Sequence, residues 1–194
     1  MREAKLVRKT NETDIELFLK LDGNGLARIE SGIGFLNHML VLFSKHGFLD
    51  LDLKCKGDLD VDGHHTIEDI GIVLGQALKQ ALNNKEGIVR YSTKFTPMDE
   101  ALSMVSLDIS GRPYLYFDVP MEREYVGSFE TELLEEFLRS FAYNAGITLH
   151  IKLIHGKNNH HIIESIFKGL GRAIDEAITI SPKVKGVLST KGTL

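Results

Sequence analysis

Cysteine is nearly absent from this chain of 194 residues, which contains Cys55 and no other thiol. A single cysteine excludes an internal disulfide and suits a reducing compartment, so we expect a cytoplasmic location. Long apolar runs are also missing, since no stretch approaches the roughly 20 residues that a membrane-spanning helix requires. The segment 1–14 is polar and has no apolar core, so a secretory signal is not expected.

The chain also lacks an excess of either charge. Lys and Arg total 23 against 27 Asp and Glu, which gives a formal net charge of −4. There is no long Lys/Arg run and no interleaving of basic and aromatic residues, so we expect no nucleic-acid partner. Hydrophobic residues make up 43% of the chain, which is enough for a sizeable core and one or two domains.

Two histidine-rich segments are the most unusual feature that the sequence does contain. Residues 64–69 (HHTIED) in the first half recur as residues 160–165 (HHIIES) in the second half. On a helix, positions i and i+4 lie on one face, so the first histidine and the glutamate of each segment can bind one metal ion. The second histidine points about 100° away and needs another ion or another function.

The apolar periodicity predicts the same order of elements in both halves. In the first half we expect strands at 4–8, 15–20, 26–30 and 49–55, with helices at 35–46 and 64–83. In the second half we expect strands at 101–109, 114–119 and 147–154, with helices at 129–144 and 161–178. The segment 22–25 (DGNG) is a strong hairpin signal between two of the first strands.

The two halves align as an internal duplication of a long unit, not as a short solenoid repeat. We expect an α+β fold in which each strand-rich unit carries two helices and two sheets enclose the packed helices. The predicted organisation is a first repeat at 1–93, a second repeat at 94–180 and a substrate-binding or docking tail at 181–194. All three parts are expected to form one compact unit.

The duplication predicts two metal sites, each built from both halves. The ligands expected at the first site are His64, Glu68, His161 and Glu136. The ligands expected at the second site are His160, Glu164, His65 and His38. Imidazole and carboxylate without thiolate suit Mn(II), Fe(II), Zn(II) or Co(II). Four protein ligands on an octahedral ion leave positions open for a substrate, as in catalytic metal sites.

His38 and Glu136 enter this set because they occupy equivalent positions in the two halves. His38 precedes the first histidine pair by 26 residues, and Glu136 precedes the second by 24. Asp69 is expected to interact with the helix N-terminus or to accept a hydrogen bond beside the site. The remaining histidines have no repeat partner of ligand type and are expected to be structural: His46, His150 and His155.

Basic residues near the motifs form a candidate phosphate-binding group. Lys168 lies four residues after Glu164 and so faces the same side of the helix. Further donors come from Arg90, from Arg112 and from the segment 189–192 (STKG). Each of these charges alone is more typical of a solvated surface residue, so spacing does not establish the group.

Six segments together resemble the imidazoleglycerol-phosphate dehydratase family over essentially the whole chain. They are residues 34–40 (GFLNHML), 62–69 (DGHHTIED), 99–102 (DEAL), 110–114 (SGRPY), 158–164 (NNHHIIE) and 189–192 (STKG). The family dehydrates imidazole-glycerol phosphate to imidazole-acetol phosphate in L-histidine biosynthesis. The resemblance therefore implies a hydro-lyase that acts on a small phosphorylated imidazole substrate.

The resemblance also implies a site and an assembly. It implies two Mn²⁺ ions per active site, a duplicated α+β fold of the ribosomal-protein-like second-domain type, and a shell of 24 subunits with metal sites at subunit boundaries. The implied catalytic metal ligands are His38, His64, His65, Glu68, His160, His161 and Glu164. The implied substrate contacts are Glu12, Arg90, Arg112, Lys168, Ser189, Thr190 and Lys191. In the implied mechanism the substrate imidazolate bridges the two ions, and Glu12 moves the proton of carbon 2.

Glu136 departs from the family, in which many members carry a histidine at this position. A carboxylate can replace imidazole at a hard divalent ion and favours Mn(II), so Glu136 is a predicted ligand. The alternative is that Glu135 or water occupies its place.

Two other classes of function fit parts of the pattern. A binuclear metallohydrolase usually bridges its ions with carboxylates, whereas imidazoles dominate here. A metal-storage or scaffold protein would bind metal without turnover and would have no role for Arg112 or Lys168.

Overall fold

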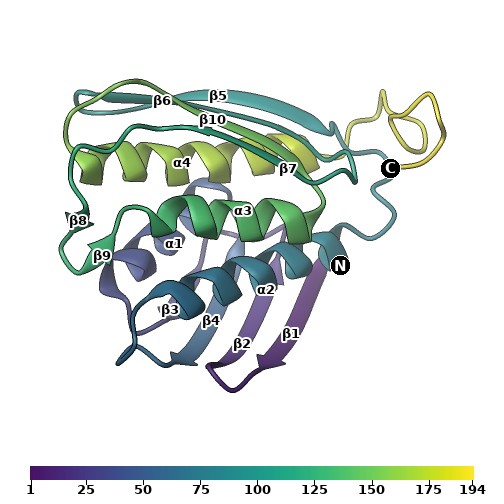
Figure 1. Ribbon diagram of the computed structural model, residues 1–194. Coiled ribbons are helices and arrows are strands. Elements are labelled where there is room, and N and C mark those ends of the chain that lie inside the picture. The colour runs from purple at the N-terminus through teal and green to yellow at the C-terminus, as the bar shows by residue number, and fades with distance from the viewer.

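The structure, a computed structural model, describes residues 1–194 as two four-stranded sheets that enclose four helices (Figure 1). The first repeat contains β1 (Glu3–Lys9), β2 (Thr13–Lys20), β3 (Ala27–Glu30), α1 (Gly34–His46), β4 (Asp50–Gly57) and α2 (His64–Leu82). The second contains β5 (Tyr91–Met98), β6 (Ala101–Asp108), β7 (Tyr114–Asp118), β8 (Tyr125–Val126), β9 (Phe129–Glu130), α3 (Leu133–Ala145), β10 (Thr148–His155) and α4 (Asn159–Ile178). The sheet orders β1-β2-β4-β3 and β5-β6-β10-β7 are equivalent, which confirms the predicted duplication and the α+β class.

Strand alternation places the core between the sheets. In β2, Ile15, Leu17 and Leu19 are almost fully buried, while Glu16 points outward. This is the period of two that a sheet with one covered face requires. Helix α2 lies on β1 and β2, and α4 lies on β5 and β6. The buried apolar side chains of both repeats join into a single cluster.

The helices of the two repeats pack against each other in pairs, α1 on α4 and α2 on α3. Glycine permits this close approach at equivalent positions of the two repeats. A Cβ atom at Gly171 would lie 2.5 Å from the carbonyl oxygen of Phe43, and one at Gly75 would lie 2.5 Å from that of Phe141. The pairing of α1 with α4 is what brings residues of different repeats to one site.

The predicted hairpin at 22–25 is wrong. Strand β3 pairs in parallel with β4, and β4 pairs with β2, so β4 lies between the two strands that the turn connects. The reason is Asp50, the first residue of β4, whose Oδ1 accepts hydrogen bonds from the backbone N–H groups of Asn24 and Leu26. The segment therefore wraps around the Asp50 carboxylate as a wide connection.

One further element and two boundaries differ from the prediction. No strand is predicted from the sequence at β5, which is an edge strand that pairs only with β6 and tolerates Pro97 for that reason. Helix α3 begins at Leu133 because the β8–β9 hairpin occupies the preceding residues. Helix α4 begins at Asn159, so both histidines of its motif are helical.

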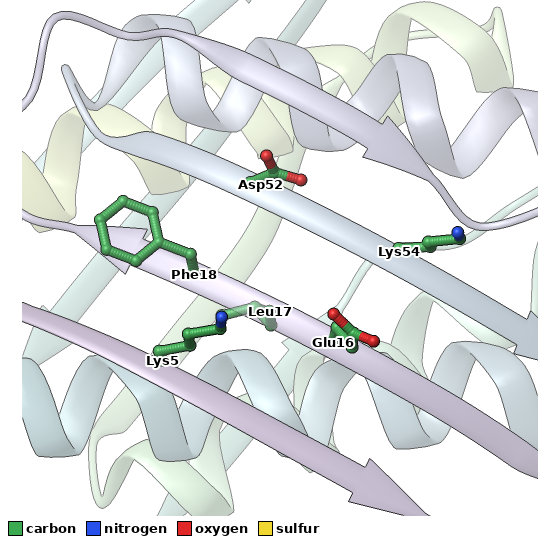
Figure 2. A pocket seen from close by; sticks show the side chains of 6 residues that line it. All are labelled: Lys5, Glu16, Leu17, Phe18, Asp52 and Lys54. Carbon is green, nitrogen blue, oxygen red and sulfur yellow. The ribbon is translucent and has the colours of Figure 1, made fainter.

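The outer face of the first sheet carries charged side chains on neighbouring strands. Glu16 on β2 lies opposite Lys54 on β4, and Phe18 lies between Lys5 and Asp52. Figure 2 shows these side chains around a shallow hollow of about 320 Å³. Cross-strand pairs of this kind stabilise a solvated sheet face, and none of the predicted site residues lies here. No helix of the chain combines the length and apolar character needed to cross a membrane.

We expect Gly171→Ala to lower the free energy of unfolding by about 2 kcal/mol, because the added methyl group would overlap the Phe43 carbonyl. In an open helix the same change would stabilise the fold by about 1 kcal/mol. Urea unfolding at a fixed protein concentration measures the difference. Gly34→Ala is the matched control, since a Cβ there meets nothing within 4 Å. Equal stability of the wild type and Gly171→Ala would contradict the packing described here.

Candidate metal centre

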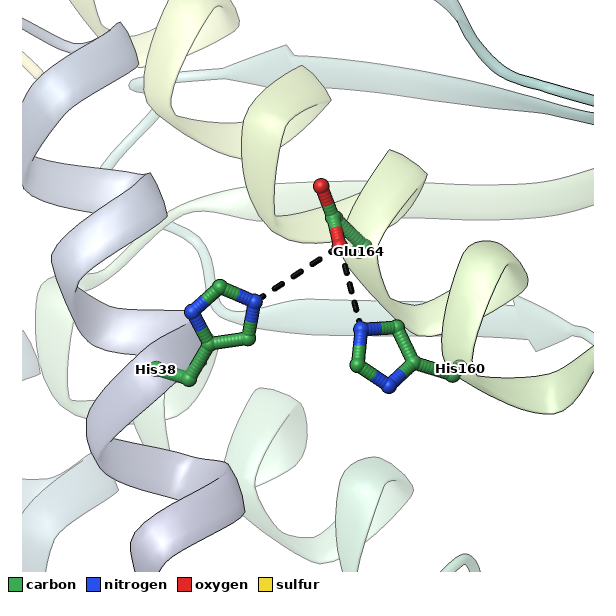
Figure 3. Close-up of side chains that lie close together, drawn as sticks. All are labelled: His38, His160 and Glu164. Atoms are coloured by element: carbon green, nitrogen blue, oxygen red, sulfur yellow. Dashed lines mark hydrogen bonds and ion pairs between the residues drawn. The ribbon is translucent and has the colours of Figure 1, made fainter.

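Helices α1 and α4 bring His38, His160 and Glu164 together (Figure 3). One ligand atom from each residue lies within 4.8 Å of the others. The Nε2 atom of His160 is 3.1 Å from Glu164 Oε2, and that of His38 is 3.6 Å from the same oxygen. Both imidazoles are about half exposed, whereas Glu164 is buried. This is the only group of three or more such ligands that the chain brings together.

The Glu164 carboxylate stays ionised despite its burial. Burial alone would raise its pKa, but the Lys168 ammonium group and His160 hold that pKa below its ordinary value. Lys168 Nζ lies 2.5 Å from Glu164 Oε1, while Oε2 faces the two histidines. One carboxylate oxygen thus pairs with a cation and the other points at the imidazoles. This division leaves a negative oxygen where a metal ion would bind.

Both histidine-rich helices begin with a similar side-chain hydrogen bond. Asp62 Oδ1 accepts from the backbone N–H of His64 at 2.7 Å, and Asn158 Oδ1 accepts from that of His160 at 2.9 Å. Asp and Asn are favoured at helix starts because they satisfy backbone N–H groups that have no partner in the helix. The first histidine of each pair is therefore fixed at the first turn.

The second histidine of each pair contacts carboxylates from loops. His65 Nδ1 lies 2.9 Å from Asp58, and His161 Nδ1 lies 2.7 Å from Glu100. The hydrogen bond that each histidine donates to its carboxylate raises the pKa of that histidine. The His161 contact, with a hydrogen bond from the Asn158 backbone, lowers the pKa of Glu100 to about 2.

A single chain does not gather the two predicted four-ligand sets. His65 does not join His38, His160 and Glu164, because it faces the β1–β2 turn, where its Nε2 lies 3.7 Å from Glu12. The members of the other set, which come from α2, α3 and α4, form no such group: His64, Glu68, Glu136 and His161. Helix α4 packs on α1 and not on α2, which separates His161 from the α2 ligands.

Glu136 lies on α3, and α3 packs on α2 as α1 packs on α4. Its carboxylate is 3.9 Å from Arg139 Nε, and Arg139 also bonds Glu135. Glu136 therefore lies on the helix that packs against α2, as His38 lies on the helix that packs against α4. Its role as a ligand stays a prediction, as does the alternative of Glu135.

The basic candidates divide between two places. Arg90 and Arg112 line a hollow of about 750 Å³ together with Ser189, Thr190 and Lys191. Arg90 is buried, forms a bidentate pair with Asp108 and donates to the carbonyl oxygen of Leu188 at 2.6 Å. Lys168 is not part of this hollow and lies at the His38–His160–Glu164 group instead.

Sequence reasoning missed Asp58 and Glu100 as neighbours of the site. Glu100 lay within the DEAL segment, and Asp58 within an acidic loop, but neither has a helical spacing to the histidines. Glu100 also lines a hollow of about 570 Å³ at the start of α4, beside the β8–β9 hairpin. For Asp69, the expectation of a hydrogen-bond acceptor beside the site is close to the structure. The Asp69 carboxylate is buried and accepts hydrogen bonds from Arg8 on β1 and Thr13 on β2.

The fold and the site define a class: a duplicated α+β protein in which two imidazoles and a carboxylate from different repeats form a group that could hold a metal ion. Residues 31–174 match the imidazoleglycerol-phosphate dehydratase family. The enzyme of that name from Clostridium novyi (strain NT) is 62% identical over 193 residues, 100% of this chain and 98% of that protein. The one from Thermoanaerobacter pseudethanolicus is 60% identical over the full length of both chains.

Solved structures agree. The imidazoleglycerol-phosphate dehydratase of Staphylococcus aureus superposes with a TM-score of 0.84 at 45% identity, over 92% of this chain and 99% of that one. The Pyrococcus furiosus enzyme, in complex with (S)-C348, gives 0.84 at 39% identity, over 97% and 100%. This chain belongs to the imidazoleglycerol-phosphate dehydratase family. It is a hydro-lyase of histidine biosynthesis.

We expect Lys168→Met to lower the free energy of unfolding at pH 7 without metal by about 2 kcal/mol, because Glu164 would lose its cation while staying buried. A carboxylate whose pKa is lowered in the fold stabilises it above the unfolded pKa, and this contribution is lost as the pH falls through the folded value. The deficit should therefore shrink below about pH 4.5. Urea unfolding in EDTA from pH 3 to 8 measures it.

Lys79→Met, at an exposed position of α2 without an ion pair, serves as the control and should change stability by less than about 0.5 kcal/mol. A deficit in Lys168→Met that is the same at every pH would contradict the coupling to Glu164.

Proposed function

We propose that the protein converts imidazole-glycerol phosphate to imidazole-acetol phosphate with two Mn²⁺ ions per active site and with Glu12 as the group that carries the carbon-2 proton. The observation that supports this most directly is the His38–His160–Glu164 group, which joins α1 and α4. We also propose that the enzyme acts in the cytoplasm.

The residues present suit a divalent ion of this kind. Two imidazole nitrogens and one carboxylate oxygen suit Mn²⁺, and no thiolate is nearby to favour a softer ion. Glu164 is ionised and buried, while the two half-exposed histidines leave room for substrate. His38, His160 and Glu164 would hold one ion, with His65 as the fourth ligand. A bound ion would supply Lewis-acid polarisation of the substrate and hold its ring in place.

Assembly of several chains follows from the ligands that one chain leaves apart. His65 and His161 lie away from their predicted partners, and both are accessible at the surface. A neighbouring chain can supply His65 to the His38 group and His161 to the His64 group. This supports the 24-subunit shell that family resemblance implies, with the metal sites at the boundaries between subunits.

Glu12 is suited to proton transfer because its carboxylate is exposed and pairs with no lysine or arginine. The turn that carries it is rigid: Thr10 Oγ1 accepts from the backbone N–H groups of Glu12 and Thr13 at 3.1 and 2.9 Å. Thr13 in turn donates to the buried Asp69 at 2.5 Å. A carboxylate held this way can accept the carbon-2 proton and return it to the hydroxyl that leaves the neighbouring carbon, so that H and OH depart as water. The C–H electron pair forms the new carbon–carbon double bond, and the resulting enol tautomerises to the ketone.

Substrate phosphate would bind where cationic and hydroxyl donors meet. Arg112 is exposed in the hollow that contains the tail residues Ser189, Thr190 and Lys191. Arg90 holds this tail through the carbonyl oxygen of Leu188, and its other side-chain hydrogen bonds go to Asp108. Lys168, beside Glu164, would contact the substrate at the metal end.

We expect wild-type protein with Mn²⁺ to dehydrate imidazole-glycerol phosphate and EDTA to abolish this turnover. Glu12→Gln should lower kcat at least about a hundredfold, because an amide cannot accept the proton. Its affinity for Mn²⁺ should stay within about threefold of wild type. Product formation and isothermal titration calorimetry measure the two effects. Glu16→Gln, on the outer face of β2, is the control and should retain normal kcat.

Several results would contradict the proposal. Near-normal kcat in Glu12→Gln would remove the role of Glu12. Full activity of protein whose metal content is shown to be zero would exclude the metal centre. Release of phosphate from generic esters, without dehydration, would indicate a metallohydrolase instead.

A further inference from the structure

Glu100 uses both of its carboxylate oxygens at the start of α4. It occupies the turn between β5 and β6, directly before β6. Its Oε1 accepts from the backbone N–H groups of Asn158 at 2.8 Å and Lys157 at 3.3 Å. Its Oε2 lies 2.7 Å from Nδ1 of His161. One side chain therefore connects the loop before α4 to the second histidine of the motif.

This contact determines which nitrogen of His161 carries the proton. An ionised carboxylate only accepts hydrogen bonds, so Nδ1 of His161 must be the donor. In the neutral ring Nε2 is then unprotonated and offers its lone pair. A histidine that binds a metal through one nitrogen commonly donates from the other to a carboxylate in this way.

In each repeat one carboxylate lies at Nδ1 of the second histidine and another lies near Nε2, where Asp99 Oδ2 is 3.8 Å from His161. Glu12 lies directly before β2, as Glu100 lies directly before β6. Glu12, however, lies 3.7 Å from the Nε2 side of His65 and not at Nδ1. The Nδ1 contact of His65 is made by Asp58, which follows β4. Equivalent turns of the duplicated fold thus carry a glutamate with different neighbours.

We infer that Glu100 is the positioning residue of His161: it fixes the Nδ1–H tautomer and presents Nε2 to a divalent metal ion. The inference extends the proposed function, on which the metal part rests. In the first repeat Asp58 orients His65, which frees Glu12 to face the substrate. The duplicated turn has therefore diverged, with one glutamate for chemistry and one for positioning.

Glu100→Gln separates positioning from a purely structural role. The amide oxygen can still accept hydrogen bonds from the backbone N–H groups of Lys157 and Asn158, so the loop before α4 keeps both of these contacts. The amide NH₂ then faces His161 Nδ1 and donates to it, which requires the Nε2–H tautomer. That tautomer has no lone pair on Nε2, so it cannot bind metal there without first losing its preferred hydrogen bond.

Solid-state ¹⁵N NMR of histidine-labelled, metal-free protein tests the tautomer directly. The signals missing from His161→Asn identify His161. We expect a protonated Nδ1 in the wild type and a protonated Nε2 in Glu100→Gln. The same tautomer in both proteins would overturn the inference. This readout needs no metal and no turnover, so it stands even if the proposed function fails.

Calorimetric titration with Mn²⁺ tests the consequence. Glu100→Gln should bind one class of ion about ten- to a hundredfold more weakly than the wild type, with unchanged thermal stability of the metal-free protein. Glu122→Gln is the matched control, because it removes a charge from the same hollow without contacting His161, and its affinity should stay near wild type. Equal weakening in both variants would show a charge effect and overturn the positioning role. If the wild type itself binds no Mn²⁺, the proposed function fails. The tautomer measurement alone then decides whether Glu100 positions His161.

Discussion

The close contact between α1 and α4 is the constraint on which the site depends. Gly171 lets α4 approach the backbone of α1 at Phe43, and the same contact carries His38 to His160 and Glu164. Neither repeat contains this group by itself. Because Gly75 plays the same part between α2 and α3, the duplicated fold creates two equivalent helix pairs, and each pair carries one histidine-rich motif.

Contacts with carboxylates then orient the histidines of the motifs. Glu164 is buried between Lys168 and two imidazoles, so its ionised Oε2 atom faces the position where a metal cation would bind. Asp58 and Glu100 hold the Nδ1 atoms of the second histidines, and the Nε2 atoms lie 3.7 Å from Glu12 and 3.8 Å from Asp99. The site is therefore a layered arrangement in which the predicted metal ligands are oriented by carboxylates that are not predicted ligands. Asp69 extends this arrangement to the turn that carries Glu12.

Much of this could be predicted from the sequence, because helical spacing is local information. The pairing of His160 with Glu164 follows from a spacing of four residues, and the link to His38 follows from the duplication. The strand order could not be predicted, since alternating burial in β4 is the same whether β4 lies at the sheet edge or between β2 and β3. The contacts of Asp58 and Glu100 depend on loops whose course is set by tertiary packing. The contact between His65 and Glu12 could not be predicted for the same reason.

We propose that His38, His160 and Glu164 bind a divalent ion at the junction of the two repeats. Anomalous diffraction at the manganese edge, from crystals grown with Mn²⁺, tests it most directly. We expect an anomalous peak within coordination distance of Nε2 of His38, Nε2 of His160 and Oε2 of Glu164. Peaks confined to other positions, with these three side chains still paired to one another, would contradict it.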